Sequence, residues 1–160
     1  MTAPRIYAET TFVSYLTARP SRDLIVAGHQ QITRDWWAAR RTSYELCISQ
    51  LVIQEAQDGD PQAAQDRLDV LADMTLLIIT EEALQLAEEL VQAGALPEKA
   101  ENDALHIAIA TIHRLPYLLT WNCRHLANVL MRPMIESVCA SNGCTAPIIC
   151  TPEEIMEARS

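Results

Sequence analysis

The sequence predicts an α/β fold with a mostly parallel central sheet of about five strands. Short apolar runs rich in β-branched residues and leucine alternate along the chain with longer segments in which apolar residues recur at helical spacing. The 160 residues, 49% of them hydrophobic, suffice for one domain with its own core. Because strands that alternate with helices form parallel sheets, we expect a single α/β domain over residues 1–160.

The first half of the chain is expected to supply two strands and four helices. Pro20 and the Asp-Gly-Asp-Pro run that ends at Pro61 break the helical pattern, and Ser21 is a suitable N-cap for a long helix. Pro61 itself fits the first turn of the helix that follows. The expected strands are residues 5–9 and 44–49, and the expected helices are residues 10–18, 21–41, 51–57 and 61–73.

The second half is expected to supply three strands and three helices. Thr80, followed by two glutamates, begins a helix with acids at its positive end, and Gly94 ends it. Thr151 and Glu154 have the spacing of a capping box, which is typical of a helix start. The expected strands are residues 74–79, 117–121 and 148–150, and the expected helices are residues 80–94, 101–114 and 127–141.

The net charge of −9 argues against a general surface for polyanions, which is expected to be basic. It leaves room for a nuclease that holds metal ions, because such a site concentrates carboxylates. Eleven of the twelve basic residues are arginines, whose planar fork suits phosphate. The block of residues 34–41, which contains Trp36 and Trp37, is one candidate phosphate-binding patch. The alternative is a solvated helix face with the tryptophans in the core or at a protein interface.

Cysteine usage and the N-terminus predict a cytoplasmic protein. The five cysteines are odd in number, contain no Cys-x-x-Cys pair and match no common zinc spacing, which favours reduced thiols. The first residues lack the pattern of an export signal. No apolar stretch approaches the ~18–20 residues needed to span a bilayer, so we expect no membrane association.

Three acids and an amide are expected at the carboxyl edge of the sheet. Glu9 ends the first strand, Glu55 lies in the helix after the second, Asp103 lies in the first turn of the helix before the fourth, and Asn122 follows the fourth. Ligands of parallel sheets bind at this edge, and clustered carboxylates there need a cation. Mg²⁺ or Mn²⁺ suits such oxygen ligands. Each residue alone also fits a structural role, as a helix-start acid, a solvated side chain or a turn residue.

Four segments, in order, resemble the motifs of PIN-domain proteins. Residues 5–16 (RIYAETTFVSYL) resemble their opening strand, which ends in an acid before Thr/Ser and an apolar helix. Residues 49–55 (SQLVIQE) and 102–110 (NDALHIAIA) resemble the second and third acidic motifs, and residues 118–126 (LLTWNCRHL) resemble the fourth. Within that superfamily, the size is closest to the toxins of VapC-type toxin–antitoxin modules.

The resemblance implies a three-layer PIN-like sandwich and a Mg²⁺- or Mn²⁺-dependent endoribonuclease. Glu9, Glu55 and Asp103 would bind the metal directly or through water, and Asn122 would hold a metal-bound water or orient a neighbour. Thr10 or Thr11 would hydrogen-bond an acid or the substrate phosphate. Arg124 follows the asparagine of the fourth motif and is a candidate for contact with RNA phosphate, and a surface arginine with no such role is the alternative. The resemblance also implies a small antitoxin as partner and a homodimer, for which the Trp36–Trp37 pair is a candidate interface. His106 shares a helix face with Asp103, where it is expected to pack against a neighbour, with contact to phosphate or to an acid as the alternative.

Two departures from the PIN pattern define an alternative function. Glu9 stands where the family usually has Asp, and Asn122 stands at a position that is often Asp. Because Mg²⁺ demands near-ideal geometry, both changes favour a catalytically impaired PIN-like domain that binds RNA or a protein. A receiver- or phosphatase-type domain is disfavoured because Lys99, the only lysine, does not follow a late strand. A dinucleotide-binding protein is disfavoured because G-x-G-x-x-G is absent.

Overall fold

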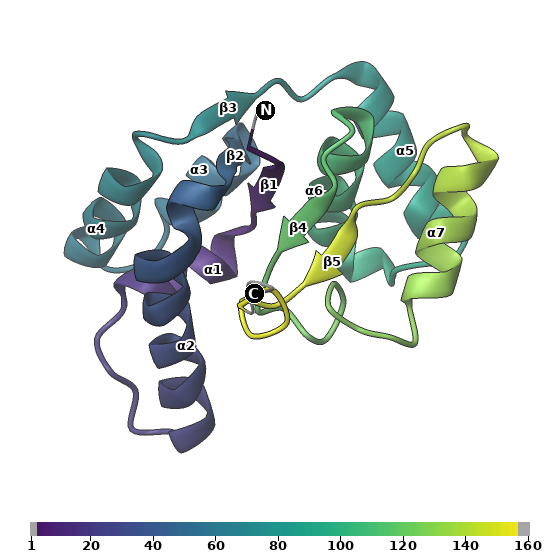
Figure 1. Ribbon diagram of the computed structural model, residues 1–160. Helices are drawn as coiled ribbons and strands as arrows, with labels where there is room; N and C mark the ends of the chain where they lie inside the picture. Colours follow the sequence, from purple (N-terminus) through teal and green to yellow (C-terminus); the bar gives the residue numbers. More distant parts are fainter. Residues whose placement is uncertain (1–2, 157–160) are drawn as a thin grey trace.

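The computed structural model describes residues 3–156, and it contains five strands, seven α-helices and two short 3₁₀ helices within them (Figure 1). The strands are β1 (Arg5–Ala8), β2 (Glu45–Ser49), β3 (Thr75–Leu77), β4 (Tyr117–Leu119) and β5 (Ile148–Cys150). The helices are α1 (Thr10–Thr17), α2 (Leu24–Arg40), α3 (Gln50–Ala56), α4 (Pro61–Leu71), α5 (Glu81–Gln92), α6 (Glu101–Ile112) and α7 (Arg132–Ser141), with η1 (Arg41–Ser43) and η2 (Glu98–Ala100).

The five strands form one sheet in the order β3-β2-β1-β4-β5, and all four neighbouring pairs are parallel. β1 lies at the centre, where Ile6 is aligned with Leu46 of β2 on one side and with Tyr117 of β4 on the other. The predicted α/β class, with a parallel sheet of about five strands, is confirmed.

The strand order reverses direction between β1 and β4. The chain first moves outward from β1 to β3 and then returns to β4 before moving outward to β5. Because parallel crossovers are right-handed, the two halves place their helices on opposite faces. Accordingly, α1 contacts α2, α3 and α4, whereas α5 contacts α6 and α7, and the two groups flank the sheet in Figure 1. The carboxyl ends of β1 and β4 are therefore the switch point at which ligands of such sheets bind.

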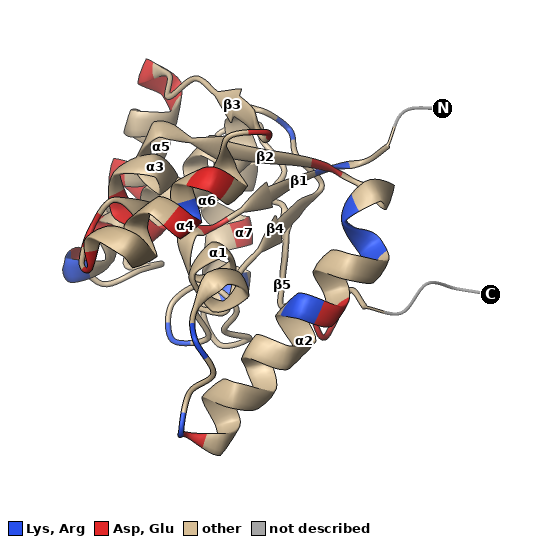
Figure 2. Cartoon of the chain, turned by 90° about the vertical axis from the view of Figure 1, so that its left-hand side faces the viewer, with Lys and Arg blue, Asp and Glu red and all other residues tan. Residues whose placement is uncertain are grey.

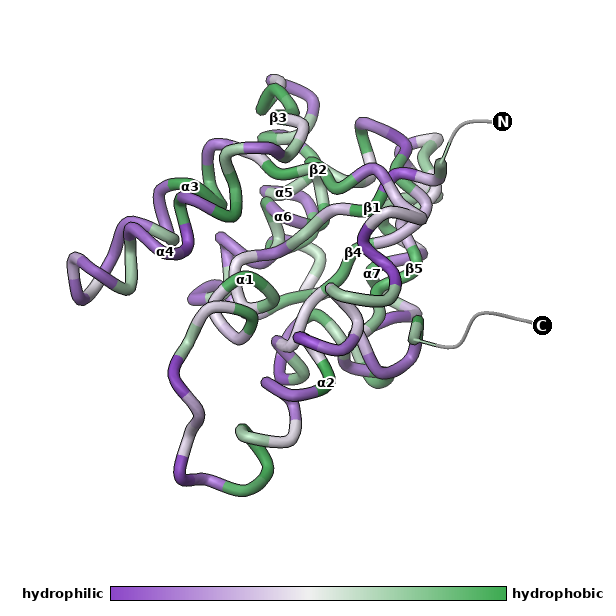
Figure 3. Tube along the Cα trace, turned by 60° about the vertical axis from the view of Figure 1, so that its left-hand side comes forward, coloured by the Kyte–Doolittle hydropathy of each residue, from purple (hydrophilic) through white to green (hydrophobic). Residues whose placement is uncertain are grey.

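The core lies on both faces of the central strands. Green stretches in Figure 3 occur along the strands and on the helices as well. Ile6, Tyr7 and Ala8 of β1 have no exposed surface, and α6 is buried along most of its length. Trp36 of α2 is also fully buried, with its ring edge-on to Phe12 at a centroid distance of 5.5 Å. Trp36 is thus unavailable to RNA or to a second subunit, and the core interpretation of the tryptophan block holds for this residue.

Two helix starts differ from the sequence prediction. α2 is capped by Asp23, whose carboxylate accepts hydrogen bonds from the amides of Ile25 and Val26. The Ser21 hydroxyl accepts from the amide of Asp23 instead of capping the helix. α7 begins at Arg132 rather than near residue 127. The intervening residues form turns, because Asn128 bonds both the Arg124 carbonyl and the Leu130 amide through its side chain.

The capping box at Thr151 forms both of its hydrogen bonds, although no helix follows it within the described residues, which end at residue 156. The Thr151 amide donates to the Glu154 carboxylate at 2.9 Å, and the Glu154 amide donates to the Thr151 hydroxyl at 3.3 Å. Residues 152–155 form only a turn. Among the described helices, none has the length and apolar content to cross a membrane.

Candidate functional site

Glu9 lies at the switch point of the sheet, directly after β1 and at the N-cap of α1. Its amide donates to the carbonyl of Leu119, the last residue of β4, at 3.0 Å. This bond continues the pairing of β1 with β4 by one residue, so Glu9 and Thr120 leave the sheet side by side. The site is therefore assembled on the two central strands.

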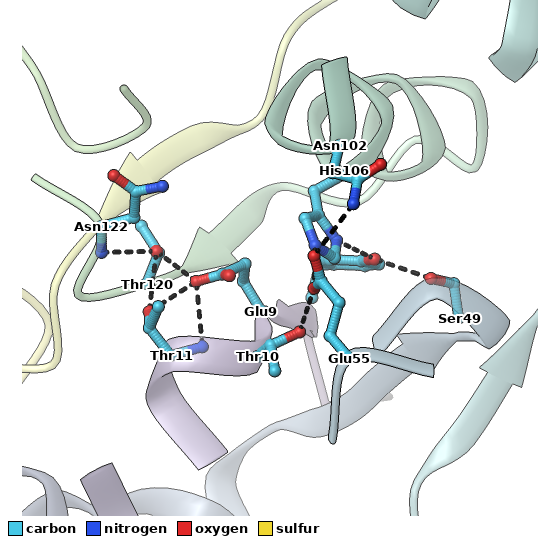
Figure 4. A network of polar contacts seen from close by, with 10 residues as sticks. Glu9, Thr10, Thr11, Ser49, Glu55, Asn102, His106, Thr120 and Asn122 are labelled. Carbon is cyan, nitrogen blue, oxygen red and sulfur yellow. Dashed lines mark hydrogen bonds and ion pairs between the residues drawn. The ribbon is translucent and has the colours of Figure 1, made fainter. Parts of the chain in front are cut away.

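One oxygen of the Glu9 carboxylate is held by three donors, and the other is not (Figure 4). Oε1 accepts hydrogen bonds from the hydroxyl of Thr11 at 2.5 Å, the hydroxyl of Thr120 at 2.6 Å and the amide of Thr11 at 3.2 Å. Within the described residues, Oε2 accepts none. Burial raises the pKa of Glu9, and the charge of His106 and the two threonines offset only part of this effect. The carboxylate is thus costly to keep charged unless a cation is near.

Glu55 projects from α3 toward the same edge and is also held through one oxygen. Its Oε1 accepts from the Thr10 hydroxyl at 2.5 Å and lies 2.8 Å from Nε2 of His106. Its Oε2 has only a long contact, 3.5 Å, with the side-chain amide of Asn102. Burial alone would raise the pKa of Glu55, but the hydrogen bond and charge of His106, with the other two donors, lower it overall.

His106 of α6 is fully buried between Glu55 and the core. Its Nδ1 lies 2.7 Å from the hydroxyl of Tyr7, which is in turn 2.8 Å from the hydroxyl of Ser49. Burial by itself would lower the pKa of His106, yet the hydrogen bond to Glu55 and the nearby carboxylates raise it. Both ring nitrogens of His106 therefore have a hydrogen-bond partner, Tyr7 in the core and Glu55 at the acidic site.

Glu9, Glu55 and His106 together form the candidate metal centre. One ligand atom of each lies within 4.8 Å of the other two, and no other such group occurs in the part of the chain that the structure describes. The donor set fits a divalent cation, because a buried carboxylate with a raised pKa keeps one oxygen without a hydrogen bond beside a second carboxylate. Carboxylate oxygens are the ligands that Mg²⁺ and Mn²⁺ prefer.

Asp103 lies at the start of α6 but bonds to another partner. Its Oδ2 is 3.0 Å from Nδ1 of His125, and both side chains are mostly buried. Its charge contributes to the raised pKa of His106, which places it near the centre. Asp103 is nevertheless outside the group of three that meets directly, so its predicted role as a metal ligand stays a prediction.

Asn122 directs its side-chain oxygen into a turn. Oδ1 accepts from the backbone amides of Arg124 and His125 at 3.2 and 3.1 Å. The backbone amide of Asn122 donates to the Thr120 hydroxyl at 2.9 Å. The Asn122 side chain thus fixes the loop after β4. Arg124 is exposed on that loop, and its predicted contact with RNA phosphate stays a prediction.

Three residues of the network around the acids were not expected from the sequence: Thr120 bonds Glu9, Asn102 contacts Glu55, and Tyr7 bonds His106 rather than an acid. Thr120 was part of the fourth quoted motif, but its contact with Glu9 spans 111 residues. Tyr7 and Asn102 carried no signal of their own, because a tyrosine in a strand and an asparagine at a helix start have ordinary structural roles. Thr10 and Thr11 each bond an acid, which is one of the two roles expected for them.

The comparisons with known proteins agree with this arrangement at the level of the fold. The sequence matches no protein-family model and no curated protein. The structure resembles Mycobacterium tuberculosis VapC20, a toxin that cleaves the sarcin–ricin loop, with a TM-score of 0.60 and 14% identity over 75% of this chain and 92% of that one. It also resembles a chain of VapBC2 from Rickettsia felis, bound to a DNA fragment from their promoter, with a TM-score of 0.54 and 16% identity over 91% and 97% of the two chains. The protein therefore has the fold of the VapC-type PIN-domain toxins.

Proposed function

We propose that the protein is a Mg²⁺- or Mn²⁺-dependent endoribonuclease that acts as the toxin of a toxin–antitoxin pair. The observation that carries the proposal is the meeting of Glu9 and Glu55 at the switch point, each with one oxygen held by the protein. The fold shared with a toxin that cleaves the sarcin–ricin loop supports the same reaction class.

Glu9 and Glu55 would hold the cation, with Asp103 and Asn122 acting through water. A divalent cation at this position supplies a nucleophilic water near neutral pH and offsets charge that builds up on the phosphodiester. Thr10, Thr11 and Thr120 keep the two carboxylates in place. Preorganised ligands of this kind avoid the cost of ordering the site when the substrate binds.

Arg124 would contact the RNA backbone next to the acids. It is exposed, and its place on the turn after β4 brings it to the same edge of the sheet as Glu9. Acidic segments lie on α4, which faces the viewer in Figure 2, and on α5. Because acids repel phosphate, RNA would approach past the Arg124 loop rather than across those helices.

The resemblance to a VapBC2 chain supports a small antitoxin as partner. We further propose that the protein forms a homodimer and acts in the cytoplasm, where cellular RNA is available.

A second function, an impaired PIN-like domain that binds RNA or protein, is favoured by two contacts. Asp103 is paired with His125, and the Asn122 oxygen is committed to a turn. Both residues would need to exchange these partners to serve a metal.

The test is RNA cleavage by purified protein that is free of partner, with total RNA and tRNA as substrates. Cleavage is expected with Mn²⁺ or Mg²⁺, and it should be lost with EDTA and in Glu55→Gln and Asp103→Asn. The matched control is Glu89→Gln, which removes an exposed acid of α5 and should cleave like the wild type. Absence of cleavage, together with no change in melting temperature on adding Mn²⁺, would favour the binding module.

Expression in cells gives an independent test of the toxin role. Growth arrest is expected for the wild type and relief is expected for Glu55→Gln. A small protein encoded with the toxin should copurify with it. Arrest that persists in the Glu55→Gln variant would contradict the proposal.

A further inference from the structure

A chain of buried polar side chains runs through the core and ends at Glu55. It links Ser49 of β2 to Tyr7 of β1 at 2.8 Å, Tyr7 to His106 of α6 at 2.7 Å, and His106 to Glu55 of α3 at 2.8 Å. Ser49, Glu55 and His106 are labelled in Figure 4. Residues from four elements are therefore joined by three hydrogen bonds.

The three interior residues of this hydrogen-bonded series add little stability that apolar residues of the same shape would not provide. Ser49, Tyr7 and His106 have no exposed surface. A buried polar group must be hydrogen-bonded to avoid a penalty, and replacing such a pair with apolar groups of the same shape is often nearly neutral for stability. Packing alone gives no reason to place an imidazole at this position. The one end of the chain that reaches the site is the Glu55 carboxylate.

The two ring nitrogens of His106 have separate tasks. Nδ1 meets the Tyr7 hydroxyl, and the ring also packs edge-on to Tyr7 at a centroid distance of 5.5 Å. Nε2 donates to Oε1 of Glu55, the same oxygen that accepts from Thr10. Oε1 of Glu55 thus accepts hydrogen bonds from α1 and from α6. Among the described residues, Oε2 has only the long contact with Asn102.

We propose that His106 is a positioning residue that fixes Glu55 for a divalent cation, and that Tyr7, anchored on Ser49, sets the orientation of the His106 ring. This inference rests on the proposed metal-dependent function. It adds three residues, none of them an acid, to the machinery that prepares the site. Partners that orient metal ligands in this way are typically worth 10–100-fold in affinity or activity (roughly).

His106 could instead be a metal ligand itself, since its nitrogen lies in the group of three. The hydrogen bonds oppose this role. A ligand nitrogen needs a free lone pair directed at the metal, whereas Nε2 is 2.8 Å from a carboxylate oxygen and donates to it, and Nδ1 faces a hydroxyl in the core.

The test measures Mn²⁺ binding by calorimetry, which does not depend on turnover. His106→Leu, which removes both nitrogens, should weaken binding about 10–100-fold, and His106→Gln, which restores a donor, should recover part of the loss. Tyr7→Phe keeps the ring and removes only the hydroxyl, so it provides a milder variant with a smaller loss. The matched control is Thr111→Val, a buried α6 residue whose hydroxyl bonds the Ile107 carbonyl, and it should bind Mn²⁺ like the wild type.

Three results would overturn the proposal. Unchanged or tighter Mn²⁺ binding in both His106→Leu and Tyr7→Phe would show that the chain does not serve Glu55. Pulsed EPR of the Mn²⁺-loaded wild type that detects a directly bound imidazole nitrogen would make His106 a ligand instead. Absence of Mn²⁺ binding by the wild type would overturn the proposed function along with this inference. The first two results differ from it, because in both the wild type binds Mn²⁺.

Discussion

The hydroxyl of Thr120 lies 2.6 Å from Oε1 of Glu9, although 111 residues separate them in the sequence. The bond joins the ends of the two central strands and is buried. It also shows how the protein holds a glutamate at the position where the resembled PIN motif usually has aspartate. The longer side chain is tied back to the protein by Thr120 and Thr11, so its extra length does not leave the carboxylate loose.

Thr120→Val should lower Mn²⁺ affinity and cleavage more than it lowers the stability of the fold. The change keeps the shape of the side chain and removes a donor to a charged group, which costs about 1–3 kcal/mol of stability. Cleavage and Mn²⁺ affinity should fall about 10–100-fold. Thr111→Val is the control, because it removes a buried hydroxyl remote from the acids and should lower the melting temperature without changing cleavage. Equal cleavage by the two variants would contradict the role of Thr120.

Glu9→Gln should stabilise the metal-free protein while abolishing cleavage. The pKa of Glu9 is raised in the folded state, so its contribution to stability is fully present below the unfolded value of 4.5 and is lost as pH rises through the folded pKa. At neutral pH the charged form is therefore destabilising, and glutamine mimics the protonated form. Each kcal/mol gained would raise the melting temperature by about 2–4 °C.

The melting temperature of Glu9→Gln should be compared with that of the wild type in EDTA at neutral pH and again near pH 4. The gain should shrink at the acidic pH, where Glu9 of the wild type becomes protonated. A lower melting temperature for the variant at neutral pH would mean that the charged carboxylate is already compensated.

Asn122→Asp should strengthen metal binding. Aspartate preserves an acceptor for the amides of Arg124 and His125, so the turn after β4 should survive. The new negative charge lies next to Thr120 and hence close to Glu9, and we expect Mn²⁺ affinity to rise by about one order of magnitude. Asn122→Ala, which loses the turn bonds, separates the two effects: it should lower stability without tightening Mn²⁺ binding. Calorimetry on both variants provides the measurement.

Alkaline pH should destabilise the fold through two buried thiols. Burial raises the pKa of Cys47 to about 11 and that of Cys150 to about 12, from an ordinary value of 9.0. Groups with raised pKa values stabilise the fold fully below their unfolded value, and this contribution is lost as pH rises through the folded values. A Cys47→Ala/Cys150→Ala variant should therefore lose less stability between pH 9 and 11 than the wild type. Denaturant unfolding at both pH values tests this, and parallel losses would argue against it.

The order of strands and helices followed from the sequence because each element depends on local patterns. The run 74–79 and the Thr80 cap, for example, both correspond to observed features, β3 and the start of α5. The loop before α7 could not be predicted from the sequence. Residues 127–131 have a helical pattern, but the side-chain hydrogen bonds of Asn128 hold them in turns. The capping box at Thr151 shows the converse, since its bonds form although residues 152–155 form only a turn.

The convergence of Glu9 and Glu55 was predictable because both acids follow parallel strands, whose carboxyl ends meet at one edge. Contact with an acid was one of the alternatives expected for Thr10, Thr11 and His106, but the particular pairings were not predictable. His106 reaches Tyr7 across 99 positions and Glu55 across 51, and no local pattern encodes such pairings. The pairing of Asp103 with His125 is likewise a tertiary event.

The strand order also governs when the site can exist during synthesis. β1 leaves the ribosome early, but its neighbour on one side, β4, is made more than a hundred residues later. Until then Glu9 lacks Thr120, and a growing chain has no enclosed acidic centre. If the protein cuts RNA, a growing chain that ends before β4 lacks the assembled centre, because Glu9 does not yet have Thr120 beside it.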